Sequence, residues 1–519
     1  MNDSPAKTAP RGAPRIIPRS DHPVSRSAIS QNALRVLYRL KDAGYQGFLV
    51  GGCVRDIILG RHPKDFDVAT DALPEEVRRL FRNCRLVGRR FRLAHVVYGQ
   101  EVIEVATFRA ASAPPPSEEP MPGREEDEEG LLAVEADEEG ADDEGDDEED
   151  EDGEDDEGDD DGDDEGADDG DSADDGRTGG RHEGGRAAAH NPHRHQDDRG
   201  RLLRDNIYGS IDEDVWRRDF TVNALYYNIA DFSIWDYAGG LEDIHARRLR
   251  LIGDVETRYR EDPVRMLRAA RFEAKLGFRL DGPSSAPIPR LRELLAGVPP
   301  ARLFDETTKL FLSGDAEASL RVLRERGLLG ELFPSVARYL DQHPDGAVSQ
   351  LLEQGLRDTD ARVAADRPVT PTYLLALLLY GPIAARIEAM PPERWTEPSA
   401  ILEACDAALR DACQRVAIPK RFTLGVRELI ALQPRLENPR GRRALRLLEQ
   451  PRFRAAYDLL LLRARLGLAS PAVAEWWEKL QLAAPDLREQ MGDTLQSADA
   501  TEPDGAPRRR RRRRPRRRG

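Results

Sequence analysis

Hydrophobic positions in residues 26–112 switch repeatedly between helix-like and strand-like spacing. The stretch "SQNALRVLYRLKDAG" places Leu34, Leu37 and Leu40 on one face and stops at Gly44, which predicts a helix. Short apolar strands are predicted at "GFLV" and "DFDVAT", separated by one or two helical turns in "CVRDIILG". A helix at "LPEEVRRLF" and a hairpin at "HVVYGQEVIEVATFR", turning near Gly99, complete a small α/β domain with a mixed sheet.

Helical spacing dominates from about Tyr259 to Leu480, with Gly and Pro residues at the joints. The longest apolar stretch, "YLLALLLY" from Tyr373 to Tyr380, suits a core helix. It is far shorter than the ~18 apolar residues that indicate a membrane span, so we expect no such span. The predicted fold class is therefore α+β, with a small α/β head followed by an all-α region.

Charge divides the chain into two unlike parts. Residues 118–175 contain 36 Asp and Glu and a single Arg, so they carry −35, whereas the whole chain carries −18 and the remainder +17. The acidic stretch has almost no aromatic or β-branched residues and predicts a disordered insertion at 113–200. The basic remainder, which ends in ten arginines around Pro515, indicates a polyanionic partner such as nucleic acid.

These patterns predict five segments along the chain and a cytoplasmic location. The quoted N-terminus, "MNDSPAKTAPRGAPRIIPRS", lacks the apolar segment of a secretion signal. Four cysteines fit no zinc framework, and we expect buried thiols in a reducing compartment: Cys53, Cys84, Cys405 and Cys413. The expected segments are a disordered N-terminus (1–25), a small α/β domain (26–112 and 201–240), the insertion (113–200), a long helical region (241–480) and a disordered arginine-rich tail (481–519).

Asp65 and Asp67 stand out as two charges in an apolar strand-like run. Alternation along a strand places both on one face, while Phe66 and Val68 point to the core. Two neighbouring carboxylates repel unless a cation lies between them. Mg²⁺, with Mn²⁺ as an alternative, suits such a pair, and two such ions can clamp the attacking and leaving oxygens of a phosphoryl transfer. The alternative is an exposed edge strand with solvated acids.

Polar and glycine residues around this pair extend the hypothesis to a nucleotide site. Gly51 and Gly52 allow the backbone to approach a triphosphate closely, and Arg55 supplies a cation. The spacing does not fit the GxxxxGK[ST] P-loop. A third carboxylate is offered by both Asp219 in "RRDFTVNAL" and Glu104 in "EVIEVATFR", and spacing does not choose between them.

Three ordered motifs resemble the class II nucleotidyltransferases, which comprise bacterial poly(A) polymerases and CCA-adding enzymes. They are "VGGCVRDIILGRHPKDFDVAT", "RRDFTVNALYY" and "YREDPVRMLRAARFEAKLGF". Further stretches resemble the poly(A) polymerase family in particular, among them "LFRNCRLVGRRFRLAHVVYGQEVIEVATFR", "AIPKRF" and "LLEQPRFRAAYDLLLLRA". The resemblance runs from about residue 28 to 480 and fails at the acidic insertion.

This resemblance implies template-independent addition of AMP from ATP to RNA 3′ ends, with release of pyrophosphate, by a monomer that promotes RNA decay. It implies a head (26–112 and 201–240), a helical neck (241–300) and a helical body (301–480). It also implies catalytic roles for Asp65, Asp67 and Asp219, of which Asp65 and Asp67 match the metal-binding pair. Glu104 is a possible further metal ligand from its place in a strand-like run, not from the resemblance. RNA-decay proteins are candidate partners. The implied nucleotide-binding residues are Gly51, Gly52, Arg55, Arg218, Asp262, Arg265, Arg268 and Arg271.

The residues of the third motif give this implication a physical basis. Arg265, Arg268 and Arg271 recur at i, i+3 and i+6, which predicts a slowly rotating basic stripe on a helix that Asp262 opens beside Pro263. A carboxylate and a guanidinium held together can hydrogen-bond a base edge. The alternatives are an ordinary charged helix face, a CCA-adding enzyme, and a non-catalytic RNA-binding protein.

The acidic insertion generates the first prediction. We expect a solubilising or salt-adapted segment rather than an RNA mimic that competes for the basic regions. Deletion of residues 118–175 should then leave RNA affinity at low salt unchanged, measured by filter binding or fluorescence anisotropy. Tighter RNA binding by the deleted protein at low salt would establish the mimic instead.

Overall fold

The computed structural model describes residues 12–88, 92–110, 194–196, 202–205, 208–439, 441–484 and 486–491. The chain divides into two units, one of residues 1–111 with 194–519 and one of residues 112–193. The described residues belong to the first unit. Most of the predicted insertion, and the predicted tail from residue 492 onward, lie outside the described residues.

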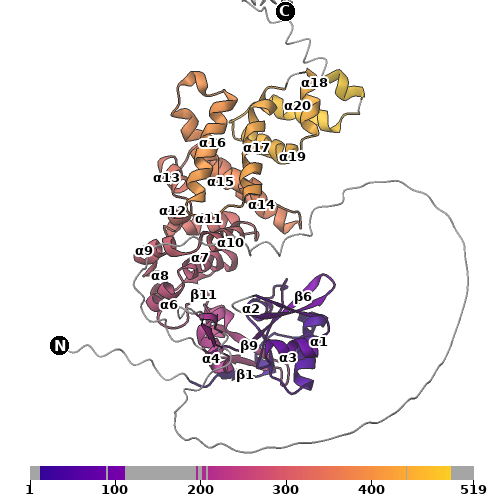
Figure 1. The fold of residues 1–519 in the computed structure, drawn as a ribbon, viewed down its shortest axis with the longest axis vertical. Coiled ribbons are helices and arrows are strands. Elements are labelled where there is room, and N and C mark those ends of the chain that lie inside the picture. The colour runs from indigo at the N-terminus through magenta and orange to yellow at the C-terminus, as the bar shows by residue number, and fades with distance from the viewer. Residues whose placement is uncertain are drawn as a thin grey trace, which may run out of the picture. The chain divides into compact units, whose positions relative to one another are not determined.

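An eight-stranded mixed sheet forms the centre of the head (Figure 1). The strand order is β1-β10-β9-β2-β3-β6-β5-β4, and each neighbouring pair is antiparallel except β3 and β6, which are parallel. The strands are β1 (Arg15–Ile17), β2 (Gly47–Val50), β3 (Asp67–Thr70), β4 (Cys84–Val87), β5 (Leu93–Tyr98), β6 (Glu101–Thr107), β9 (Leu225–Asn228) and β10 (Ile234–Asp236).

One face of this sheet packs on the helices α1 (Gln31–Asp42) and α3 (Pro74–Leu80). The α1 helix begins where the Ser30 side chain accepts a hydrogen bond from the Ala33 amide, and its apolar face, Leu34, Leu37 and Leu40, is buried. Gly44, with φ of 88°, follows the helix as predicted. The structure therefore confirms the helix, the strand β2 and the β5–β6 hairpin that apolar periodicity predicted, and Gly99 occupies the hairpin turn.

The opposite face of the sheet carries one continuous row of residues in register. Its first half is apolar and, except for the exposed Ile16, lies in a small core with α4 (Ile211–Arg217), whereas its second half, from β3 onward, is polar or charged. The division between the two halves falls at β3, where the strand begins with Asp67. In order across the sheet the row is Ile16, Trp235, Tyr226, Val50, Asp67, Glu104, His95 and Arg85.

Helices make up nearly all of the described residues after the head, as the sequence predicted (Figure 1). The exception is β12 (Arg279–Leu280), which pairs in parallel with β11 (Arg248–Leu249). The predicted core stretch "YLLALLLY" lies in α15 and is buried except near its ends. The helices are α6 (Val255–Glu261), α7 (Val264–Leu276), α8 (Gly282–Ser285), α9 (Ile288–Leu291), α10 (Pro300–Phe311), α11 (Ala316–Glu325), α12 (Leu329–Leu332), α13 (Pro334–Gln342), α14 (Ala347–Ala364), α15 (Pro371–Glu388), α16 (Pro398–Cys413), α17 (Lys420–Glu437), α18 (Gly441–Leu448), α19 (Phe453–Arg465) and α20 (Pro471–Leu482).

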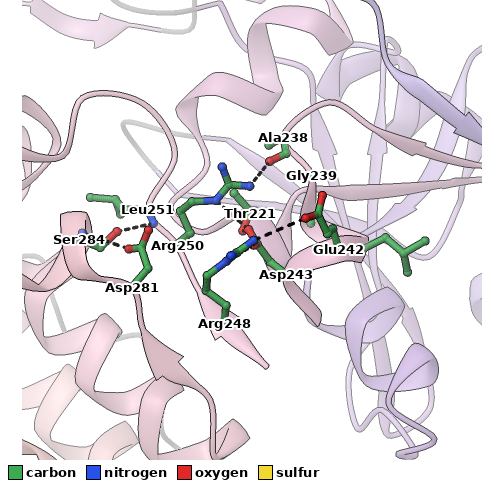
Figure 2. A network of polar contacts seen from close by, with 12 residues as sticks. Thr221, Ala238, Gly239, Glu242, Asp243, Arg248, Arg250, Leu251, Asp281 and Ser284 are labelled. Carbon is green, nitrogen blue, oxygen red and sulfur yellow. Dashed lines mark hydrogen bonds and ion pairs between the residues drawn. The ribbon is translucent and has the colours of Figure 1, made fainter. Parts of the chain in front are cut away.

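A buried carboxylate joins the end of the head to the strand β11. Asp243, on the helix α5 (Gly240–His245), is fully buried and accepts hydrogen bonds from Thr221 Oγ1 at 2.6 Å, Arg248 Nε at 2.6 Å and Arg250 Nε at 2.9 Å (Figure 2). The Thr221 amide in turn donates to the Arg250 carbonyl at 3.0 Å. This network fixes the segment that begins with Asp219, whose carbonyl accepts from the Ile252 amide at 2.8 Å.

Several sequence expectations require correction. The N-terminal segment is ordered from residue 12, because β1 pairs with β10 and Ile17 enters the core. Asp65 precedes β3 and is exposed, so it is not a strand residue. The insertion ends in the strand β7 (Arg194–Gln196), which pairs with β8 (Leu202–Asp205). Cys413 is exposed, although the other three cysteines are buried.

Within the described residues, none of the helices combines the length and the apolar character needed to cross a membrane.

The Asp243 network generates a stability prediction. Asp243→Asn should lower the free energy of unfolding by about 2–4 kcal/mol, because two arginines lose their buried counter-charge. Urea unfolding followed by circular dichroism measures this. The matched control is Glu242→Gln, since Glu242 is 76% exposed and 3.9 Å from Arg248; its effect should stay below about 0.5 kcal/mol. Equal effects of the two substitutions would contradict the structural role of Asp243.

Candidate active site

A cavity of about 880 Å³ brings together residues from all three sequence motifs. Its walls come from the start of α2 (Gly52–Ile58), the loop before β3, the segment after α4, and the helix α7. Arg271 and Glu104 are the two predicted site residues that do not line it. The predicted residues that do line it are Gly51, Gly52, Arg55, Asp65, Asp67, Arg218, Asp219, Asp262, Arg265 and Arg268.

The Gly51–Gly52 turn brings backbone directly against the carboxylate of Asp67. Gly51 has a φ of 78°, a backbone conformation that residues with a side chain rarely adopt. A Cβ at this position would lie 3.5 Å from Asp67 Oδ2. A Cβ on Gly52 would lie 3.4 Å from Arg55 Nη2. The turn therefore leaves a narrow, side-chain-free floor between an aspartate and an arginine, which is suited to phosphate oxygens.

Asp67 lies in an environment that disfavours its own negative charge. Burial, together with the nearby charges of Glu104 and Asp65, raises the pKa of Asp67 to about 6, and the Arg218 guanidinium opposes this only in part. A divalent cation at this position would relieve that repulsion. The carboxylate chemistry therefore fits a cation held by Asp65 and Asp67.

Glu104, one of the two candidates for a third carboxylate, lies next to Asp67 but does not complete a metal-binding group. Within the described residues, no group of three or more His, Cys, Asp and Glu side chains could hold a metal ion. Glu104 is the register partner of Asp67 on the parallel strand β6, and its charge acts on Asp67. Its side chain is 49% exposed and lies 3.6 Å from His95 Nε2.

Asp219, the other candidate, is bonded to Arg268. Its Oδ2 accepts from Arg268 Nε at 2.8 Å and Nη2 at 2.5 Å, and its Oδ1 accepts from the Phe220 amide at 2.7 Å. Burial alone would raise the pKa of Asp219, but Arg268 and these hydrogen bonds hold it below its ordinary value. Its charge is thus neutralised by protein, unlike that of Asp67.

A hydrogen-bonded chain links this pair to the glycine turn through Asn223. Arg55, only 2% exposed, donates to Asn223 Oδ1 at 2.6 Å and to Asp56 Oδ1 at 2.8 Å, and Asn223 Nδ2 donates to Asp219 Oδ1 at 3.3 Å. The sequence interpretation missed Asn223. The available signal was its position as a polar residue inside the apolar run of "RRDFTVNALYY".

Arg218 stands beside the turn with its own fixed partners. Its Nε donates to Tyr226 Oη at 2.7 Å and to Asp214 Oδ2 at 3.2 Å. Its Nη1 lies 3.9 Å from the position of a Cβ on Gly51. The guanidinium is therefore held in one orientation, with one nitrogen toward the phosphate-sized space above the turn.

The third motif begins α7 as predicted. Asp262 follows α6 in an extended conformation, Pro263 already has helical geometry, and Asp262 Oδ1 accepts a hydrogen bond from the Val264 amide at 3.2 Å, so Asp262 caps the start of α7. Arg265 donates to the Arg258 carbonyl at 2.6 Å and to Glu261, while Asp262 accepts from Arg302 Nη2 at 2.7 Å.

The predicted basic stripe on α7 consists of paired residues. Arg271 donates to Glu306 Oε1 at 2.6 Å outside the cavity lining, and Arg268 is bonded to Asp219. Because each of these two arginines is bonded to a carboxylate, its guanidinium group is held in a fixed position. Additional positive charge on the cavity wall comes from Arg61, Lys64 and Lys275.

Three family models match the chain. The "Poly A polymerase head domain" matches residues 47–137 and 179–250. The "Probable RNA and SrmB- binding site of polymerase A" matches residues 277–340, and the "Polymerase A arginine-rich C-terminus" matches residues 393–518.

Curated relatives with the same name cover nearly the whole chain. Poly(A) polymerase I of Escherichia coli O157:H7 is 42% identical over 97% of this chain and 93% of its own length. Poly(A) polymerase I of Haemophilus influenzae is 37% identical over 92% of this chain and 90% of its own length. A CCA-adding enzyme of Bacillus velezensis is 28% identical over only 60% of this chain and 57% of its own length.

Among solved structures, a tRNA-processing enzyme in its apo form 2 has the same fold. It aligns with a TM-score of 0.51 and 19% sequence identity, and the alignment covers 89% of this chain and 99% of that one.

The environment of Asp67 generates a pH-dependent prediction. The pKa of Asp67 is raised on folding, so its charged form destabilises the metal-free protein increasingly as pH rises from about 4 to 6, and constantly above that range. Asp67→Asn removes this cost. In a chelating buffer the variant should gain about 2–3 kcal/mol of unfolding free energy over the parent at pH 8, and much less near pH 4.5.

Chemical denaturation at the two pH values measures this difference. The exposed Asp42 provides the control; Asp42→Asn should change stability by less than about 0.5 kcal/mol at both pH values. A loss of stability in Asp67→Asn at pH 8 would contradict the charge repulsion inferred for the site.

Proposed function

Because the chain belongs to the poly(A) polymerase I family, we propose that its cavity is the centre in which AMP is transferred from ATP to an RNA 3′ end. The protein is a polynucleotide adenylyltransferase, as are its relatives by name. The observation that carries the site assignment is the closeness of the Gly51–Gly52 turn to Asp67, since a Cβ on Gly51 would lie 3.5 Å from Asp67 Oδ2. It supports the proposal because backbone free of side chains lies beside a carboxylate whose charge is only partly balanced.

The reaction forms a bond between the RNA 3′-oxygen and the α-phosphorus of ATP. It breaks the bond from that phosphorus to the bridging oxygen of pyrophosphate, and the 3′-hydroxyl loses its proton. The Gly51–Gly52 turn and Arg218 hold the triphosphate in position for this exchange, with Arg55 supporting the turn from below. Fixed positive charge of this kind stabilises the developing negative charge without reorganisation during the step.

Asp65 and Asp67 would hold the divalent cation on which the superfamily depends, and we propose Mg²⁺, with Mn²⁺ as the alternative. Such an ion, when bound, supplies Lewis-acid activation of the 3′-hydroxyl and neutralises phosphate charge. Mg²⁺ binds by one or two carboxylates and completes its shell with phosphate oxygens and water. This agrees with a site in which protein supplies two carboxylates and Glu104 stands next to them.

Asp219 would orient Arg268, and the third motif would orient the incoming nucleotide. Asp219 fixes Arg268, so we propose Asp219 as a positioning residue rather than a ligand of the cation. Asp262 and Arg265, each held by its own partner, face the same cavity and are proposed to contact the base of the incoming nucleotide. Their fixed geometry allows protein side chains to select a nucleotide without a template.

The helical regions would bind the RNA by charge. We propose that the neck (241–300), the body (301–480) and the arginine-rich tail hold RNA phosphates without reading sequence. A cytoplasmic location, a monomeric state and association with RNA-decay proteins remain predictions.

Incubation with a single-stranded RNA primer, Mg²⁺ and either ATP or CTP tests the function. ATP should give long A tails and CTP little incorporation. Asp65→Ala should lower AMP incorporation by at least about 10³-fold, because the cation loses a ligand, while RNA binding in a gel-shift assay stays within about twofold.

A matched control is Asp42→Ala, which removes an exposed aspartate outside the cavity lining and should leave tailing unchanged. A single CCA addition with efficient use of CTP would identify a CCA-adding enzyme. Failure to incorporate either nucleotide would favour a non-catalytic RNA-binding protein.

A further inference from the structure

The charged half of the row across the sheet ends on an exposed face. Arg85 on β4 pairs in register with His95 on β5, and His95 pairs with Glu104 on β6, the register partner of Asp67. The three residues therefore lead in a straight line from the edge of the sheet to the candidate catalytic carboxylate. Arg85 is exposed, and the side chains of His95 and Glu104 are 25% and 49% exposed.

Apolar pairs flank this polar line on both sides. Val87 is the register partner of Leu93, and Val97 is the register partner of Val102. Val87 and Val102 are 37% and 40% exposed, although the other face of the same strands is buried against helices. No described element covers this part of the sheet. We name the surface formed by Arg85, Val87, Leu93, His95, Val97, Val102 and Glu104 the open face.

The geometry of an in-line displacement indicates which part of the substrate the open face can hold. In an in-line displacement the attacking and leaving oxygens lie on opposite sides of the phosphorus. The Gly51–Gly52 turn, which would hold the leaving pyrophosphate, follows β2 on one side of β3. The 3′-hydroxyl must then approach Asp67 from the other side of β3, which is the side of β6, β5 and β4.

We propose that the open face is the subsite for the 3′-terminal nucleotides of the RNA primer. The proposal rests on the poly(A) polymerase function given above. Arg85 would pair with a backbone phosphate, and the valine pairs would pack against ribose or base. An exposed arginine with no carboxylate of the described residues within ion-pair distance is suited to a phosphate. Positive charge beside the backbone of a single strand holds the strand without sequence preference.

Steady-state kinetics with RNA and ATP varied separately test the subsite. Arg85→Glu should raise the KM for a short single-stranded RNA about fivefold to tenfold, and the KM for ATP should stay within about twofold. The slope of log RNA affinity against log salt should become shallower by about 0.7, the value expected for one lost phosphate contact on a single strand. Arg85→Lys should restore most of the affinity.

The matched control is Arg15→Glu, an exposed arginine on β1 at the opposite edge of the same sheet. Its RNA KM should equal that of the parent. Equal RNA KM values and salt slopes for Arg85→Glu and Arg15→Glu would overturn the proposal. A merely structural role of Arg85 would alter the melting temperature of Arg85→Glu without separating the two KM values, and would overturn it as well.

Photocrosslinking gives an answer that does not depend on turnover. An RNA carrying 4-thiouridine next to its 3′ end should crosslink to peptides from β4 and β5 in the parent protein, and less in Arg85→Glu. Crosslinks confined to the helical body would overturn the proposal, as would Arg85-dependent binding of a polyglutamate peptide without Arg85-dependent binding of RNA. Absence of AMP incorporation in the parent would refute the poly(A) polymerase function, while these binding measurements still decide the subsite.

Discussion

The hydrogen-bonded chain Arg55–Asn223–Asp219–Arg268 is the constraint on which the site depends. It joins α2, which follows the glycine turn, to the segment after α4 and then to α7. Since its two arginines and one aspartate are largely withdrawn from water, each needs its partner in place. Loss of the Asp219–Arg268 link would leave charges with little access to water unpaired. This link therefore holds the segment after α4 and the first long helix of the neck to one relative geometry.

The same chain explains why two aspartates in one cavity behave differently. Asp219 receives two guanidinium hydrogen bonds, and its carboxylate is held ionised by protein alone. Asp67 has Arg218 nearby but also Glu104 and Asp65, and its charge is left in excess. The charge of Asp219 is neutralised by protein, whereas the charge of Asp67 is not. A bound cation is therefore expected at Asp67 rather than at Asp219.

Local periodicity and motif order predicted much of this, and long-range pairing accounts for what they missed. The helix at Leu34–Leu40 and the hairpin at Gly99 follow from nearby residues, and most motif residues reach one cavity. The sequence offered Glu104 as a strand residue that could lie next to the aspartate pair. Sequence spacing could not give the register that puts Glu104 opposite Asp67, because that pairing is set by the parallel β3–β6 crossover. Nor could it show that β1 completes the sheet through β10, or that Asn223 bridges two charged groups.

The register of the sheet also divides the row into an apolar half that packs in a core and a polar half that includes Asp67. From β1 to β2 the row consists of Ile16, Trp235, Tyr226 and Val50, and most of it is covered by α4. From β3 to β4 it is polar, and exposure is greater at Glu104 and Arg85 than at the half-buried Asp67 and His95. A shift of one residue in the β3–β6 pairing would turn Glu104 toward the helices and bring Val105 beside Asp67. The apolar half thus packs in a small core with α4, while the register brings Asp67, Glu104, His95 and Arg85 into one row. Under the proposed function, a nucleotide and an RNA end would meet on this row.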